Sequence, residues 1–169
     1  MFFDGGSSGN PGPGGCGAVI ARIATTAAAT EVCWIASIPH AHKSTTNNLA
    51  ATGLPSGLCT SWMGTVGDSF LITRQHRTNT APLATRLNPI YRMPPLFLCR
   101  HHRRDYNRTA NALANTAMDR TASSQLDPRQ STNLSSHWRS ALAHMADDFG
   151  HWIVLLIDEE ASASGDGTE

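Results

Sequence analysis

The sequence has few cysteines, and no two of them lie close together. It contains no CxxC motif, and its thiols stand at four widely separated positions: Cys16, Cys33, Cys59 and Cys99. A zinc knuckle or a redox-active pair needs closely spaced cysteines, so the sequence indicates neither. Isolated cysteines are typical of reduced structural thiols, and we therefore expect an intracellular protein, cytoplasmic or nuclear.

Long apolar runs are also absent. The longest uninterrupted one covers residues 152–157, whereas a membrane-spanning helix needs roughly 20 apolar residues. We therefore expect no membrane association. At 169 residues the chain suits one domain of ordinary size with an extension, and we expect a monomer.

Acidic residues are scarce in the first part of the chain. Residues 1–120 contain eleven Lys/Arg against five Asp/Glu, a balance of +6, and residues 121–169 contain two against eight, a balance of −6. The basic side chains are densest over residues 100–108: Arg100, His101, His102, Arg103, Arg104 and Arg108. Two interpretations of this cluster stay open, namely contact with nucleic-acid phosphates and a solvated arginine-rich turn.

Hydrophobic periodicity predicts an alternation of strands and helices. Strands are predicted at residues 2–4, 16–23, 31–38, 62–66 and 96–100. Helices are predicted after the polar residues 44–48, from residue 70, over 107–119 and within 137–160. Polar composition predicts a linker over 121–136 and disorder in the last nine residues. The predicted division is therefore a domain over 1–120, followed by a polar linker and acidic C-terminal extension over 121–169.

The chain opens with an aspartate, Asp4, that stands between two phenylalanines and a glycine-rich segment. Such a segment is either a flexible linker or a wide turn between two strands. The apolar runs on both sides favour the turn, with Asp4 near the end of the first strand.

Four segments resemble the ribonuclease H type 1 family in order and approximate spacing, particularly its plant, microbial and retroelement-derived branch. They are FFDGGSSGNPGPGGCGAVI, STTNNLAATGL, VGDSFLITRQ and CRHHRRDYNRTANALANTAMD, and they extend over about residues 1–119. The resemblance implies an α/β fold with a five-stranded mixed sheet, its first three strands antiparallel, flanked by helices. It also implies RNA-strand endonucleolytic hydrolysis of an RNA/DNA hybrid.

The family activity uses two Mg²⁺ ions, roughly 3.5–4 Å apart, to activate water and stabilise the leaving oxygen. Four carboxylates hold these ions in the family, and only two of them are present in this sequence. Asp4 matches the first and Asp68, in GDS, matches the third. The resemblance therefore implies a metal site at Asp4 and Asp68 in which Mg²⁺ or Mn²⁺ is weakly bound.

The other two carboxylates are replaced. Ala51 stands where the pattern NNxAExxGL has its glutamate, and the segment is one residue short. Asn111 stands where NxxADxLAN has its aspartate, and an amide offers an oxygen ligand without charge. No other acidic residue is a good substitute. Glu31 begins a predicted strand and does not lie on the first helix. Asp105 and Asp119 flank Asn111 in sequence, but a helix places Asp119 about two turns away. The chain thus resembles a degenerate member of the family with impaired catalysis.

The remaining site residues are also implied by the resemblance. His101 matches a mobile-loop histidine that assists product release, or is simply part of a basic loop. Hybrid-contacting positions are matched by four small polar residues: Asn10, Thr46, Asn47 and Asn48. Thr46 or Asn47 also suits a helix cap. Arg104 is assigned to nucleic-acid binding from the basic cluster.

Three functional classes remain open at this stage. The chain is an RNase H endonuclease, intact or weakened, or it is a non-catalytic hybrid-binding module or retroelement relic. The third class is a protein-interaction role of the acidic C-terminal segment, supported by Trp138, Trp152 and the run WIVLLI, which core packing explains equally well.

Overall fold

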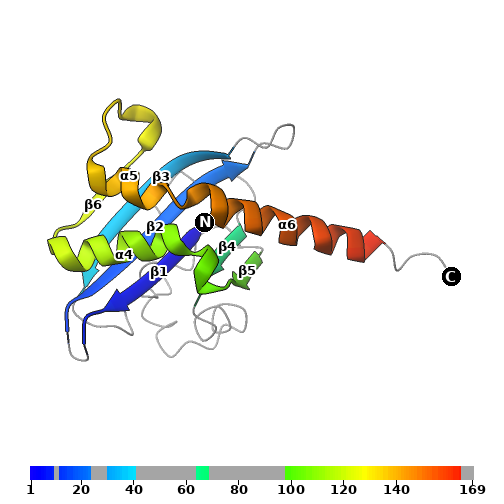
Figure 1. Cartoon of the computed structure of the whole chain (residues 1–169), viewed down its shortest axis with the longest axis horizontal. Helices are drawn as coiled ribbons and strands as arrows, with labels where there is room; N and C mark the ends of the chain where they lie inside the picture. The colour runs from blue at the N-terminus through cyan, green and yellow to red at the C-terminus, as the bar shows by residue number, and fades with distance from the viewer. Residues whose placement is uncertain (10–11, 24–29, 41–63, 69–97, 165–169) are drawn as a thin grey trace, which may run out of the picture.

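The computed structural model describes residues 1–9, 12–23, 30–40, 64–68 and 98–164 (Figure 1). The strands are β1 (Phe2–Ser7), β2 (Gly14–Ile23), β3 (Thr30–His40), β4 (Gly64–Gly67), β5 (Leu98–His101) and β6 (Ser124–Leu126). The α-helices are α4 (Arg108–Arg120), α5 (Ser136–Leu142) and α6 (Met145–Ser164). Two short 3-10 helices are η1 (Arg104–Tyr106) and η2 (Pro128–Gln130). Within these described ranges, no helix has the length and apolar character needed to cross a membrane.

The six strands form one mixed sheet in the order β5-β4-β1-β2-β3-β6. β1, β2 and β3 pair antiparallel, whereas β4 runs parallel to β1 and β5 runs parallel to β4. The mixed α/β class and the antiparallel first three strands are confirmed. The strand β1 lies in the interior of the sheet, which places Asp4 away from both edges.

The expected strand count and the linker over 121–136 need correction. This segment contains β6, a sixth strand that pairs antiparallel with residues 35–37 of β3, and it also contains η2. The sequence Ser-Gln-Leu has no β-branched residue and no alternation long enough to indicate a strand. The segment forms a strand because it pairs with the edge of β3, which provides the backbone hydrogen bonds.

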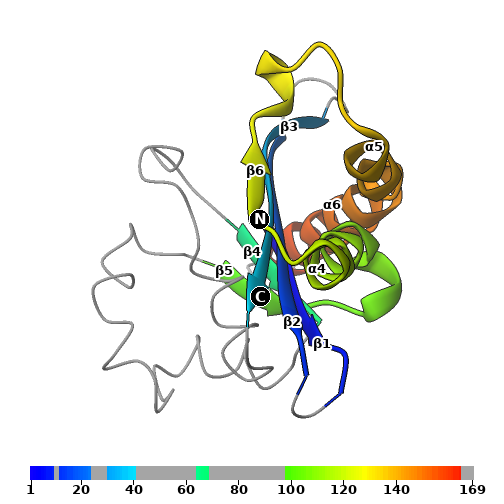
Figure 2. The same cartoon turned by 90° about the vertical axis from the view of Figure 1, so that its left-hand side faces the viewer.

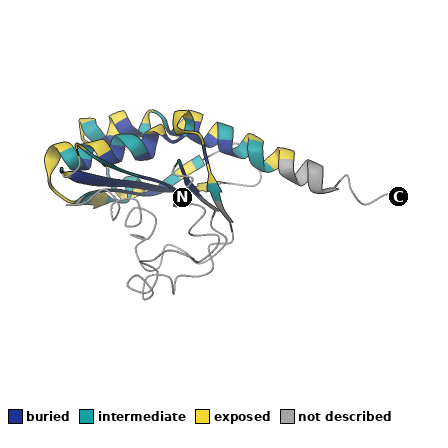
Figure 3. Ribbon diagram, turned by 90° about the horizontal axis from the view of Figure 1, so that it is seen from below, coloured by how far each residue is buried: buried dark blue, intermediate teal, exposed yellow. Residues whose placement is uncertain are grey.

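The helices α4, α5 and α6 lie on one face of the sheet (Figure 2). Side chains from β1 to β4 meet side chains of the helices in one of the two core clusters of the described residues: Phe2, Val19, Ile35, Val66, Leu113, Trp138, Phe149 and Trp152. Figure 3 shows the strands buried and the exposed residues on the outer side of the helices. The acidic C-terminal segment therefore contributes α5 and the first part of α6 to the same core as β1.

The glycines of the opening segment allow α4 to approach the sheet closely. A Cβ atom at Gly17 would lie 2.1 Å from the carbonyl oxygen of Ala110, and one at Gly15 would lie 2.1 Å from that of Ala114. Real Cβ atoms do not come so close, so only glycine fits at these two positions. The pairing of Ser7 with Gly14 also confirms that the segment joins two strands of a hairpin.

Candidate functional site

Two carboxylates meet where the parallel pairing of β1 with β4 ends. Phe3 of β1 pairs with Gly67 of β4, so the next residues along both strands, Asp4 and Asp68, lie side by side. Side chains alternate along a strand, and both aspartates therefore point to the helix-covered face, as Phe2 and Val66 do. Asp4 is 6% exposed and Asp68 is half-buried.

The surroundings of Asp4 disfavour its negative charge. Burial, followed by the charge of the neighbouring Asp68, raises the pKa of the Asp4 carboxyl to about 7. A hydrogen bond from the backbone N–H of Gly5, at 2.7 Å, and the positive charge of Arg104 act in the opposite direction. In the absence of another cation, Asp4 therefore does not carry a full negative charge at neutral pH.

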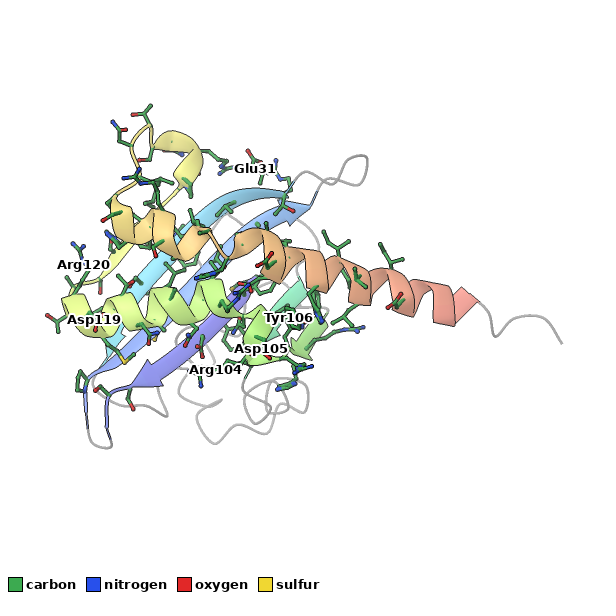
Figure 4. All side chains as sticks on the ribbon, viewed as in Figure 1. Glu31, Arg104, Asp105, Tyr106, Asp119 and Arg120 are labelled. Atoms are coloured by element: carbon green, nitrogen blue, oxygen red, sulfur yellow. The ribbon has the colours of Figure 1, made fainter. Side chains whose placement is uncertain are left out.

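Asn111 reaches the same region from α4. The guanidinium of Arg104, at the start of η1, donates a hydrogen bond from Nη2 to Oδ1 of Asn111 at 3.3 Å. The N-terminus of α4 is held beside β1 by Asn107, whose Nδ2 donates to the carbonyl oxygen of Phe3 at 2.9 Å. Asp4, Asp68, Asn111 and Arg104 thus belong to one site, and Figure 4 shows Arg104 next to β1 and the first half of α4.

His101 ends strand β5 and lies on the other side of Asp68. Its Nε2 lies 3.1 Å from the backbone carbonyl oxygen of Asp68, and its side chain is exposed. The structure therefore brings His101 to the edge of the site. The other expected contact residues, Asn10, Thr46, Asn47 and Asn48, lie outside the described residues, as Ala51 does.

None of the three other acidic residues considered for the missing positions substitutes for them. Glu31 lies at the start of β3, where it forms an ion pair with Arg22 at 3.7 Å. Asp105 pairs with Arg103 at 3.4 Å. Figure 4 shows Glu31 and Asp119 away from Arg104, the latter near the opposite end of α4.

Solved structures with the same architecture were found by comparison. A structure of LC11-RNase H1, isolated from compost by a metagenomic approach, matches with 24% identity and a TM-score of 0.52, over 70% of this chain and 94% of that chain. A crystal structure of LC11-RNase H1 in complex with an RNA/DNA hybrid matches with 22% identity and a TM-score of 0.53, over 70% of this chain and 95% of that chain. The chain has the ribonuclease H fold. No family model and no curated protein matches this RNase H-like chain.

The described donors of this RNase H-like site do not by themselves fit two metal ions. Among the described residues, no group of three or more His, Cys, Asp or Glu side chains is arranged to hold a metal ion. Asp4 and Asp68 offer two carboxylates and Asn111 offers a neutral amide oxygen, so the described donors suit one Mg²⁺ at most. Asn111 is also already an acceptor for Arg104.

The structure corrects the expected role of His102. The sequence placed it in a basic loop, but the imidazole is 2% exposed and packs against His151 with a ring-centroid distance of 4.8 Å. Burial, followed by the nearby His151, lowers the pKa of His102 to about 4. His102 is therefore a neutral core residue of the RNase H-like domain and does not contact phosphate.

Asp148 is a structurally important residue that the sequence analysis missed. Its fully buried carboxylate on α6 accepts hydrogen bonds from the backbone N–H groups of Arg108 and Thr109 at the start of α4. A side chain from another helix thus caps α4, because the side chain of Asn107 is bonded to β1 instead. Only the packing of α6 on α4 reveals this role, since 39 residues separate Asp148 from Thr109.

Proposed function

We propose that this chain binds RNA/DNA hybrids through the site around Asp4 and Asp68, and that its RNA-strand cleavage is impaired. The observation that carries the proposal is the pairing of β1 with β4, which brings the two aspartates together in an RNase H-like fold. The crystal structure of LC11-RNase H1 with an RNA/DNA hybrid supports this class of nucleic-acid partner.

Recognition of a hybrid depends on groove shape and on contacts to 2′-hydroxyl groups. Small polar side chains suit such contacts, and we assign them to Asn10, Thr46, Asn47 and Asn48. Lys/Arg contacts to phosphate supply affinity that does not depend on sequence. In this proposal the basic residues hold the duplex and the small polar residues distinguish RNA from DNA.

Impaired cleavage follows from the charge of the site. Two metal ions need several carboxylates to hold and neutralise them. Asn111 carries no charge, and the second acidic position of the family pattern is Ala51. When one Mg²⁺ or Mn²⁺ is bound, Asp4 and Asp68 are the residues that would hold it, and the ion would polarise a phosphate oxygen.

The alternative function is hybrid binding without any catalysis, as in a retroelement relic. The same two replacements favour it, and a cleavage assay separates it from weakened catalysis. A docking role for the two C-terminal tryptophans has less support, because Trp138 and Trp152 are 4% and 5% exposed and pack in the core.

Fluorescence anisotropy with the full chain tests the proposal. A labelled RNA/DNA hybrid is compared with a DNA duplex of the same sequence, each over a salt series. We expect tighter binding to the hybrid, and binding to both that weakens as salt rises. Equal affinity for the two duplexes would overturn hybrid recognition and leave nonspecific electrostatic binding.

A further inference from the structure

Arg104 differs from its neighbouring arginines in what it contacts. Arg103 is paired with Asp105, and Arg108 is paired with Asp147, so each of these arginines has a carboxylate partner. Among the described residues, Arg104 has no carboxylate within ion-pair distance, and its bonded partner is the neutral amide of Asn111. Its side chain is also exposed. Arg104 is thus a positive charge that stays available at the site.

The Arg104 guanidinium lies beside a position where the family pattern has a carboxylate and this chain has none. Arg104 bonds to Asn111, the residue at the expected fourth carboxylate position, and its positive charge also acts on Asp4. A guanidinium has five N–H donors in a planar fork that matches a phosphate group. The hydrogen bond to Asn111 uses one donor of the fork, and the others can bind a ligand.

We propose that Arg104 binds a backbone phosphate of the nucleic acid at this site and supplies positive charge that a second metal ion supplies in a four-carboxylate centre. The proposal rests on the proposed function, since it takes the ligand to be a nucleic-acid duplex. Asn111 is then part of the arrangement, because a neutral acceptor orients the guanidinium without neutralising it. Binding by this route does not require a divalent ion.

The test measures binding of the full chain to a labelled RNA/DNA hybrid in EDTA and in Mg²⁺. We expect the unmodified chain to bind in EDTA within about threefold of its affinity in Mg²⁺. Arg104→Gln should weaken binding in EDTA at least about tenfold, the size expected for hydrogen bonds to a charged group. The slope of log affinity against log salt should also become shallower by about one.

Two other variants show whether the effect belongs to Arg104. Arg120→Gln removes the same charge at the opposite end of α4 (Figure 4) and should change affinity less than about twofold. Arg103→Gln removes the adjacent, paired arginine and should weaken binding less than Arg104→Gln does. Asn111→Asp should weaken binding in EDTA, because the new carboxylate would pair with Arg104.

Equal losses for Arg103→Gln and Arg104→Gln would overturn the proposal, as would loss of all binding of the unmodified chain in EDTA. A different measurement would show that the proposed function is wrong. If the chain binds hybrid and DNA duplex equally, hybrid recognition is wrong, but the comparison of Arg104→Gln with Arg103→Gln still decides the phosphate contact. Arg104→Lys, which keeps the charge and loses the fork, should retain part of the affinity.

Discussion

The Asp148 carboxylate on α6 accepts a hydrogen bond from the backbone N–H of Thr109 at 2.8 Å, in the first turn of α4. A buried carboxylate at this position satisfies unpaired N–H groups and interacts favourably with the helix dipole. The same helix carries Asn111 one turn after Asn107, whose side chain bonds to the backbone of Phe3, the residue before Asp4. The C-terminal helix therefore helps to position the candidate site.

Asp148→Ala should lower the free energy of unfolding by about 2 kcal/mol, because it leaves the buried N–H group of Thr109 and the partly buried N–H group of Arg108 without this acceptor. Urea unfolding measures this change. Asp147→Ala is the matched control, since Asp147 is exposed and its ion pair with Arg108 should contribute less than about 1 kcal/mol. A similar small loss for both variants would contradict a capping role for Asp148.

The second prediction concerns the number of metal ions that the site binds. We expect at most one weakly bound Mg²⁺ or Mn²⁺, because each lost carboxylate reduces the attraction for a cation in a partly buried site. Isothermal titration calorimetry with each metal chloride measures the stoichiometry. Two tight sites would show that residues beyond Asp4 and Asp68 complete the centre.

Restoring both acidic positions is the third prediction. Asn111→Asp combined with a glutamate inserted after Ala50 should raise the rate of hybrid cleavage, whereas neither change alone should suffice, because ligands of one metal cluster act together. A gel assay with a labelled RNA strand follows the cleavage. If the unmodified chain already cleaves as fast as the double variant, the claim of impairment is wrong.

The pH dependence of stability in EDTA is the fourth prediction. The pKa of Asp4 rises from 3.8 to about 7 on folding, so the folded state holds this proton more tightly than the unfolded state. The stability from this group is fully present below pH 3.8 and is lost as pH rises through 7. Asp4→Asn should therefore raise the melting temperature at pH 8 and have little effect near pH 4.

The pH dependence of stability that His102 contributes has the opposite sign to that of Asp4. Its pKa falls from 6.5 to about 4 on folding, so its contribution is present above pH 6.5 and is lost as pH falls through 4. The pH profile of the unmodified chain combines both groups. The difference between the profiles of Asp4→Asn and the unmodified chain isolates Asp4, and a difference that does not change with pH would contradict the raised pKa.

Truncation after residue 120 is the fifth prediction. It removes Trp138, Phe149 and Trp152 from the core, and it leaves the apolar face formed by Phe2 and Val19 uncovered. We expect an insoluble product, because a large exposed apolar patch promotes association. A soluble fragment that unfolds cooperatively in urea would show that residues 1–120 form a domain without the rest of the chain.

The sequence predicted those elements whose pattern is local. The run of small and apolar residues in β2, the segment of β3 and the helical spacing of Ala110, Leu113 and Ala117 predicted strands and a helix that the structure confirms. The burial of His102 was missed, because its packing partner His151 lies on a helix far along the chain. The pairing of Asp4 with Asp68 came from the family resemblance, since nothing local to either residue indicates the parallel pairing of their strands.

The hydrogen bond between Asn107 and Phe3 joins residues 104 positions apart, and its place in the chain bears on how the protein folds. Pairing of β1 with β4 and capping of α4 by Asp148 also connect distant segments. Contacts of long sequence separation form slowly, because a large loop must close before they contribute energy. The site around Asp4 is therefore complete only after synthesis has continued through Asp148 on α6.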